Sequence, residues 1–209
     1  MQELVGGGEM FHYLEKDGPF DEGLCRYYFK EMLRGIHYLH TMGFSHRDLK
    51  PQNILLDDQY RLKIIDYGFV CPLEGTKGDG VNETRVGTPS YMSPELIRGE
   101  QYKGQVVDLF ALGVILFIMK AGVPPFCSAG DEDQIYQLIR QYRWGDFWTL
   151  HSRDRPAGFF SPSFKNLIEL MLSHNPVYRG NMSDIIGHPW LQCPEAGGVY
   201  THEKVLETM

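Results

Sequence analysis

His46-Arg47-Asp48-Leu49-Lys50-Pro51-Gln52-Asn53 is followed along the chain by Asp66-Tyr67-Gly68 and then by Ser93-Pro94-Glu95. Between the first two motifs, the apolar stretches 54–56 and 62–65 flank the polar segment 57–61, a pattern that predicts two short strands joined by a turn. Strands that run out and back would return Asp66 close to Asn53. The sequence therefore predicts a hairpin that brings the first two motifs together.

Helical patterns surround this hairpin. Residues 10–17 predict a short helix that Gly18-Pro19 ends, and a longer helix is predicted to begin after Asp21 and to end before Gly43. Apolar residues recur in it at three- and four-residue spacing: Leu24, Tyr28, Met32, Ile36 and Leu39.

The second half of the chain is also predicted to be mainly helical. The run from Val106 to Met119 is apolar on every side, which indicates a central buried helix. Residues 70–92 lack periodicity and predict a long loop. Further helical patterns cover 135–142, 164–172 and 182–186, and 194–209 is predicted to be a polar tail.

Composition limits the classes of function. The chain has 209 residues with 43% hydrophobic content, which is enough for one domain with a sizeable core. Its net charge of −7 argues against nucleic acid as a partner. The run from Val106 to Met119 contains Asp108 and is too short for a bilayer, so no membrane association is expected. Scattered cysteines and the lack of a signal peptide predict a reducing compartment, the cytoplasm or the nucleus.

The ordered motifs resemble those of protein serine/threonine kinases of the calcium/calmodulin-dependent-kinase-like group. The resemblance rests on His46-x-Asp48-x-Lys50-x-x-Asn53, Asp66-x-Gly68, Gly87-Thr88-Pro89 and Pro94-Glu95. It implies an α+β, mainly α, fold: a kinase-like C-terminal lobe with a short β-hairpin that carries the metal site, and with the N-terminal β lobe absent. The implied parts are a hinge segment at 1–9, the C-terminal lobe at 10–193 and the tail at 194–209. Within the lobe, the catalytic loop is 46–53 and the activation segment is 66–95.

The resemblance also implies the catalytic roles. Phosphoryl transfer asks a protein mainly to position reactants and to neutralise charge. Asp48 would orient the substrate hydroxyl, and Lys50 would meet the γ-phosphate of ATP. Asn53 and Asp66 would bind Mg²⁺ through oxygen atoms.

A nucleotide site follows from the same resemblance. The backbone of Glu3 and Val5 would meet the adenine edge, Leu55 would form the floor beneath it, and Glu9 would reach the ribose. Met10 and Tyr67 are expected, with Leu4 and Leu55, to line an apolar surface beside this site.

Other matching residues have structural roles in the family. Asp108 would anchor the backbone around His46, which is itself expected to be a packing residue. Tyr67 replaces the usual phenylalanine of the Asp-Phe-Gly motif and keeps its aromatic body. Glu95 and Arg179 match a buried ion pair at the end of the activation segment.

Regulation and substrate preference complete the expectations. Arg47, directly before Asp48, is typical of kinases that are switched on by activation-loop phosphorylation, and Thr84 is the preferred site, with Thr76 as an alternative. Glu9 would also meet a basic residue three positions before the target hydroxyl. Gln52 and Ile118 stand where relatives that require a second arginine have acidic residues, so no strong demand is expected at the next position.

Two readings of function from different classes stay open. In the first, the chain belongs to an intracellular kinase whose partners are protein substrates and an upstream activating kinase. In the second, it is a truncated, kinase-like interaction module that competes for the substrates or regulators of a full-length relative. A two-metal hydrolase built on Asp48 and Asp66 is a more distant alternative, because it would not explain Lys50.

Overall fold

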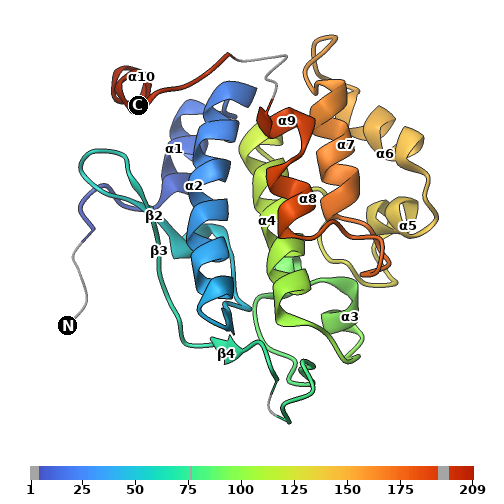
Figure 1. The fold of residues 1–209 in the computed structure, drawn as a ribbon. Coiled ribbons are helices and arrows are strands. Elements are labelled where there is room, and N and C mark those ends of the chain that lie inside the picture. Colours follow the sequence, from blue (N-terminus) through green and yellow to red (C-terminus); the bar gives the residue numbers. More distant parts are fainter. Residues whose placement is uncertain (1–4, 76, 193–197) are drawn as a thin grey trace.

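The computed structural model describes residues 5–75, 77–192 and 198–209, which form a mostly helical domain with two small antiparallel sheets (Figure 1). The helices of the first half are α1 (Met10–Asp17), α2 (Glu22–Thr41) and α3 (Pro94–Ile97), with 3₁₀ turns at Pro51–Asn53 and Pro89–Tyr91. The second half contains α4 (Gly104–Ala121), α5 (Gln134–Arg140), α6 (Trp144–Ser152), α7 (Pro162–Met171), α8 (Met182–Ile186), α9 (Pro189–Gln192) and α10 (His202–Thr208).

Helix α2 begins and ends as its sequence predicts. The Asp21 side chain accepts a hydrogen bond from the backbone N–H of Leu24 at 2.8 Å, which satisfies one of the unpaired donors of the first turn. At the other end Gly43 has a φ of +86° and its N–H bonds to the carbonyl of His40. The apolar stripe of the helix faces the core, where Tyr28 and Met32 are fully buried.

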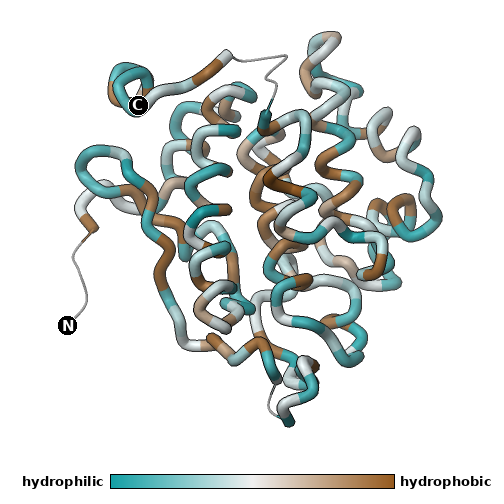
Figure 2. Tube along the Cα trace, viewed as in Figure 1, coloured by the Kyte–Doolittle hydropathy of each residue, from teal (hydrophilic) through white to brown (hydrophobic). Residues whose placement is uncertain are grey.

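Helix α4 is the centre of the core and lies beside α2 (Figure 1). Hydrophobic positions recur along α4 and α7, whereas the outer loops are mainly hydrophilic (Figure 2). A side chain at Gly113 would lie 2.9 Å from Cβ of Met171, so this glycine lets α7 approach α4 closely. Among the described residues, α4 is the one helix long and apolar enough to cross a membrane, but 83% of it is buried inside the protein. Its position in the core explains its apolar composition.

The predicted hairpin is present. Strands β2 (Ile54–Leu56) and β3 (Leu62–Ile64) pair antiparallel, with Ile54 opposite Ile64 and Leu56 opposite Leu62. Asp57 shapes the turn by accepting hydrogen bonds from the backbone N–H groups of Gln59 and Arg61, both at 2.9 Å.

The predicted loop and the region after α5 differ from expectation. The predicted loop at 70–92 begins with strand β4 (Cys71–Pro72), which pairs with β1 (Phe44–Ser45) and so ties the loop to the segment before the catalytic loop. Helix α6 was not expected, because its aromatic residues do not repeat with a helical period that stands out from its surroundings.

The predicted polar tail is also structured where it is described. Helix α10 packs against the domain through Val205, which is fully buried. The hydroxyl of Tyr27 bonds to Nδ1 of His202 at 3.0 Å, and that of Tyr200 donates to Asp21 at 2.7 Å. The two hydrogen bonds join polar groups far apart in sequence, so hydrophobic periodicity gave no sign of them.

Candidate active site

Asp108 organises the catalytic loop from the centre of α4. Its carboxylate is 1% exposed and accepts hydrogen bonds from the backbone N–H groups of His46 and Arg47 at 2.8 and 2.7 Å. The ring Nε2 of His40 lies 2.9 Å from the same carboxylate. A buried carboxylate needs such partners, and here they fix the backbone at the start of the loop.

The loop places Asp48 and Lys50 together. Nζ of Lys50 lies 2.6 Å from Oδ2 of Asp48, and the hydroxyl of Thr88 donates to Oδ1 at 2.9 Å. Asp48 is 3% exposed, so these partners compensate for burying its charge. A carboxylate has about four lone-pair sites, and it therefore keeps acceptor capacity for a further hydroxyl.

Asn53 precedes β2 and Asp66 follows β3, so both lie at the open end of the antiparallel hairpin, close to each other. The N–H of Ile65 bonds to the carbonyl of Asn53 at 3.0 Å, so the residue before Asp66 is tied directly to Asn53. The amide nitrogen of Asn53 donates to the carbonyl of Asp48 at 2.9 Å, which leaves its side-chain oxygen available.

These two side chains fit a hard cation such as Mg²⁺. Asp66 is exposed, has a φ of +62°, and uses Oδ1 to accept the N–H of Gly68 at 3.2 Å. Mg²⁺ favours one or two carboxylates with phosphate oxygens and water over a cage made wholly of protein ligands. In the described residues no group of three His, Cys, Asp or Glu side chains gathers as a metal site, so phosphate and water would have to supply the remaining ligands.

His46 and Tyr67 join the two motifs. His46 is fully buried, its Nε2 lies 3.1 Å from the carbonyl of Ile65, and its ring centre lies 5.3 Å from that of Tyr67. The hydroxyl of Tyr67, which a phenylalanine would lack, donates to the carbonyl of Ile64 at 3.1 Å. Partial burial raises the pKa of Tyr67 above its usual value, so the hydroxyl stays protonated near neutral pH.

Only some of the residues expected around adenine lie in the described part of the chain. Glu3 lies outside the described residues, and Val5 is half-buried. Leu55 is half-buried and pairs through a single β-bridge with Glu9, whose side chain is exposed. Met10 was expected on an apolar surface beside this site and that expectation is wrong: it is fully buried, because the first turn of α1 packs it into the core. Tyr67 is 55% exposed.

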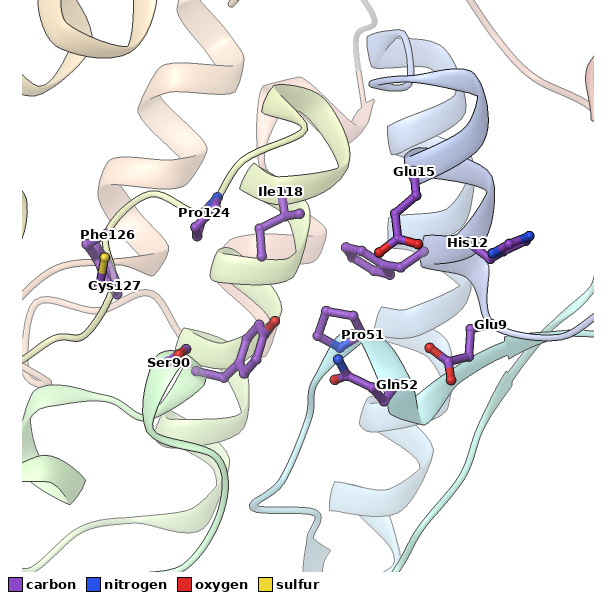
Figure 3. A pocket seen from close by; sticks show the side chains of 12 residues that line it. Glu9, His12, Glu15, Pro51, Gln52, Ser90, Ile118, Pro124, Phe126 and Cys127 are labelled. Carbon is purple, nitrogen blue, oxygen red and sulfur yellow. The ribbon is translucent and has the colours of Figure 1, made fainter.

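A cleft of about 680 Å³ lies beside the catalytic loop. Figure 3 shows Glu9, His12 and Glu15 on one side and Pro124, Phe126 and Cys127 on the other. Pro51 and Gln52, which follow Lys50 directly, also line it. An extended chain lying in this cleft would therefore pass close to the catalytic loop and to the carboxylate of Glu9.

The activation segment is anchored at its beginning and near its end. Nε of Arg47 donates to the carbonyl of Phe69 at 2.8 Å. Gly87 has a φ of +107°, and a side chain there would lie 2.7 Å from the carbonyl oxygen of Arg47. Thr84 is exposed, and Thr76 lies outside the described residues.

Glu95 and Arg179 form a buried, two-pronged ion pair. Nη1 and Nη2 of Arg179 lie 2.7 and 3.1 Å from the two carboxylate oxygens of Glu95, and both side chains are at most 3% exposed. Arg179 also donates to the carbonyl of Ser173 and stacks over Phe110. Burial by itself would raise the pKa of Glu95, but the hydrogen bonds and charge of Arg179 outweigh it and lower that pKa.

Sequence reasoning assigned no site role to His40 or to the hydroxyl of Thr88, yet both bond to carboxylates of the site. The Gly87-Thr88-Pro89 motif signalled that this region matters, without showing which atom Thr88 contacts. For His40 no sequence signal exists, because a histidine on a helix is usually an ordinary polar residue.

Comparison with known proteins shows the family of the chain. Residues 1–191 match the protein kinase domain family. The chain is 36% identical over 190 residues to CBL-interacting protein kinase 29 of Oryza sativa subsp. japonica, and 35% identical over 190 residues to CBL-interacting serine/threonine-protein kinase 26 of Arabidopsis thaliana. Each alignment covers 91% of this chain but only 40% and 41% of these relatives. The chain thus spans about two fifths of the length of these relatives, and it belongs to the protein kinase domain family.

Proposed function

We propose that the protein carrying this chain transfers the γ-phosphate of ATP to serine or threonine hydroxyls of protein substrates. The observation that carries the proposal is the convergence of Asp48, Lys50 and Asn53 on one loop whose backbone is fixed by a buried carboxylate. Family membership supports the same chemistry.

In the proposed mechanism Asp48 accepts or orients the proton of the substrate hydroxyl, and Thr88 and Lys50 hold its carboxylate in position. Lys50 also offers its positive charge to the transferred phosphate. Bound Mg²⁺ would neutralise charge on the phosphate oxygens, with Asn53 and Asp66 as its protein ligands. Val5 and Leu55, with Glu3, are proposed to meet the adenine.

A test of the metal site uses Asp66→Asn in the protein expressed in full from its own gene. We expect transfer to a serine peptide to fall by at least about a hundredfold, because the ligand that brings the metal to the phosphates is weakened. Asp58→Asn, the same substitution at an exposed position in the turn between β2 and β3, is the matched control. Equal activity of Asp66→Asn and the wild type across a Mg²⁺ titration would contradict the proposed role of Asp66.

We further propose that substrates carry a basic residue three positions before the target hydroxyl. The exposed carboxylate of Glu9 lines the cleft and forms no ion pair among the described residues, so it is available to a substrate arginine. Peptides with Arg or Ala at that position should differ about tenfold or more in kcat/KM for the wild type, and Glu9→Gln should reduce the difference. An equal preference in Glu9→Gln would reject this assignment.

Thr84 is proposed as the site for an upstream activating kinase. Its exposure makes it accessible, and Arg47 could pair with a phosphate placed near it. Thr84→Ala should lower the activity that an activating kinase induces, without unfolding the protein.

A further inference from the structure

Tyr102 lies where the activation segment, the catalytic loop and the start of α4 meet. Its side chain is 5% exposed. The hydroxyl donates to the backbone carbonyl of Thr84 at 2.8 Å and accepts from Nη1 of Arg47 at 3.0 Å. A phenol has one proton to donate, and an arginine can only donate. The hydroxyl must therefore accept from Arg47 and donate its proton to the carbonyl of Thr84.

The backbone around Tyr102 fixes where this hydroxyl can be. Tyr102 and Asn82 form an isolated antiparallel bridge, with N–H to carbonyl distances of 2.8 and 3.0 Å. Nearby, the side-chain amide of Gln101 donates to Glu83 at 3.0 Å. The activation segment is therefore docked on residues 101–102 through backbone bonds, and the Tyr102 side chain extends this contact to the catalytic loop.

Arg47 is the catalytic-loop residue that contacts Tyr102. Its backbone N–H is held by Asp108 and its Nε donates to the carbonyl of Phe69. In the described part of the chain its guanidinium contacts a carbonyl and a phenol, and no carboxylate pairs with it. Arg47 thus holds the start of the activation segment directly and holds Thr84 through Tyr102.

We propose that Tyr102 is a positioning residue whose hydroxyl couples Arg47 to the activation segment while Thr84 is unphosphorylated. The effect on catalysis rests on the proposed function, whereas the coupling is a property of the fold. A phosphate on Thr84 would offer charged oxygens to the same arginine and form stronger, charge-assisted bonds. After phosphorylation the phosphate would link Arg47 to the activation segment, as the Tyr102 hydroxyl does before it. The phosphate can therefore partly replace the hydroxyl.

Amide hydrogen exchange of Tyr102→Phe tests the coupling without relying on activity. We expect exchange across residues 77–88 to rise about five- to tenfold relative to the wild type, as one buried hydrogen-bonding centre is lost. With Thr84 phosphorylated, we expect exchange close to that of the phosphorylated wild type. Tyr136→Phe is the matched control, because it removes a buried hydroxyl that bonds to His174 at 2.9 Å, away from this segment.

Kinetic measurement then tests the consequence. Unphosphorylated Tyr102→Phe should have a kcat about five- to tenfold lower than the wild type with little change in KM for peptide, and phosphorylation of Thr84 should remove most of the difference. Tyr136→Phe should show neither effect.

The outcomes separate the two hypotheses. Wild-type exchange in Tyr102→Phe, or an increase that persists equally after Thr84 phosphorylation, would overturn the proposal. An inactive wild type would reject the proposed function, while the exchange result would still decide on the coupling. If thermal denaturation shows that Tyr102→Phe is not folded, Arg47→Lys breaks the same bond from the other side. Exchange across residues 77–88 of the unphosphorylated protein should then rise, and unchanged exchange would overturn the proposal.

Discussion

The catalytic loop and the middle of the activation segment are held in opposite ways. In the loop, His46, Asp48 and Asn53 are buried and bonded to a carboxylate or to one another. In the segment, residues 83–85 are exposed and their link to the loop passes through the Tyr102 hydroxyl. The difference shows that the side chains of the loop have fixed, buried partners, whereas the middle of the segment is held by few contacts.

The end of the activation segment should be held as firmly as the catalytic loop, and more firmly than the middle of the segment. Glu95→Ala leaves the guanidinium of Arg179 buried without a charge partner, so we expect the free energy of unfolding to fall by about 3 to 5 kcal/mol. Denaturant unfolding measures it. Glu100→Ala is the matched control, because Glu100 pairs with Arg98 at the surface and its loss should change stability by less than about 1 kcal/mol. Equal losses in the two variants would contradict the distinction.

A smaller effect is expected at the anchor of the catalytic loop. Asp108→Asn keeps the shape but places an amide NH₂ against donors from His46, Arg47 and His40, so the free energy of unfolding should fall by about 2 to 3 kcal/mol. Urea titration of the variant and of Asp146→Asn, an exposed aspartate paired with Arg143, makes the comparison. Matching midpoints for both would show that the loop is not held by Asp108.

Gly87 tests the contact between the two regions. Gly87→Ala adds a Cβ that meets the carbonyl of Arg47 in a backbone conformation that side chains rarely adopt, so a loss of about 2 kcal/mol is expected. Gly78 has a φ of +76°, and a Cβ added there would meet open space. Gly78→Ala therefore measures the cost of the backbone conformation alone. The loss should be larger at Gly87 than at Gly78 by thermal denaturation, and the reverse order would contradict the contact.

The pH dependence of stability should sharpen the contrast further. The pKa of Glu95 is lower in the folded protein than its usual value, so the folded state favours the charged form. Its contribution to stability is complete above the usual glutamate pKa of about 4.3, which applies to the unfolded chain, and is lost as the pH falls through the lower pKa of the folded state. Unfolding measured from pH 6 to pH 3 should therefore show a steeper loss for the wild type than for Glu95→Gln. Parallel pH profiles would count against the ion pair as the cause.

The parts of the fold that follow local rules could be predicted from the sequence. Asp21 and Gly43 bound α2, and the apolar run of α4 indicates burial, because caps and periodicity act over a few residues. Contacts between distant segments were predicted only where the family resemblance implied them, as for Glu95 with Arg179 and for Asp108 with the backbone of His46. The bonds from Tyr102 to Thr84 and Arg47, and the docking of Val205, depend on tertiary packing that no local pattern encodes.

The candidate site was visible in the sequence for a different reason. Its motif order identified Asp48, Asn53 and Asp66 as a group, and the hairpin gave a physical reason for Asn53 and Asp66 to approach. The partners of Asp48 were less accessible to sequence reasoning. Thr88 reaches the carboxylate from the activation segment, so its role required the folded path of that segment.

The most direct test of the central claim is phosphoryl transfer from ATP to a serine peptide by the wild type and Asp48→Asn, with both proteins expressed in full and shown to be folded. Asp48→Asn keeps the shape of the side chain but removes the charge that orients the hydroxyl, so kcat should fall by at least about a hundredfold with a similar KM for the peptide. Comparable kcat values for the two proteins would contradict the assignment of this loop as the phosphoryl-transfer site.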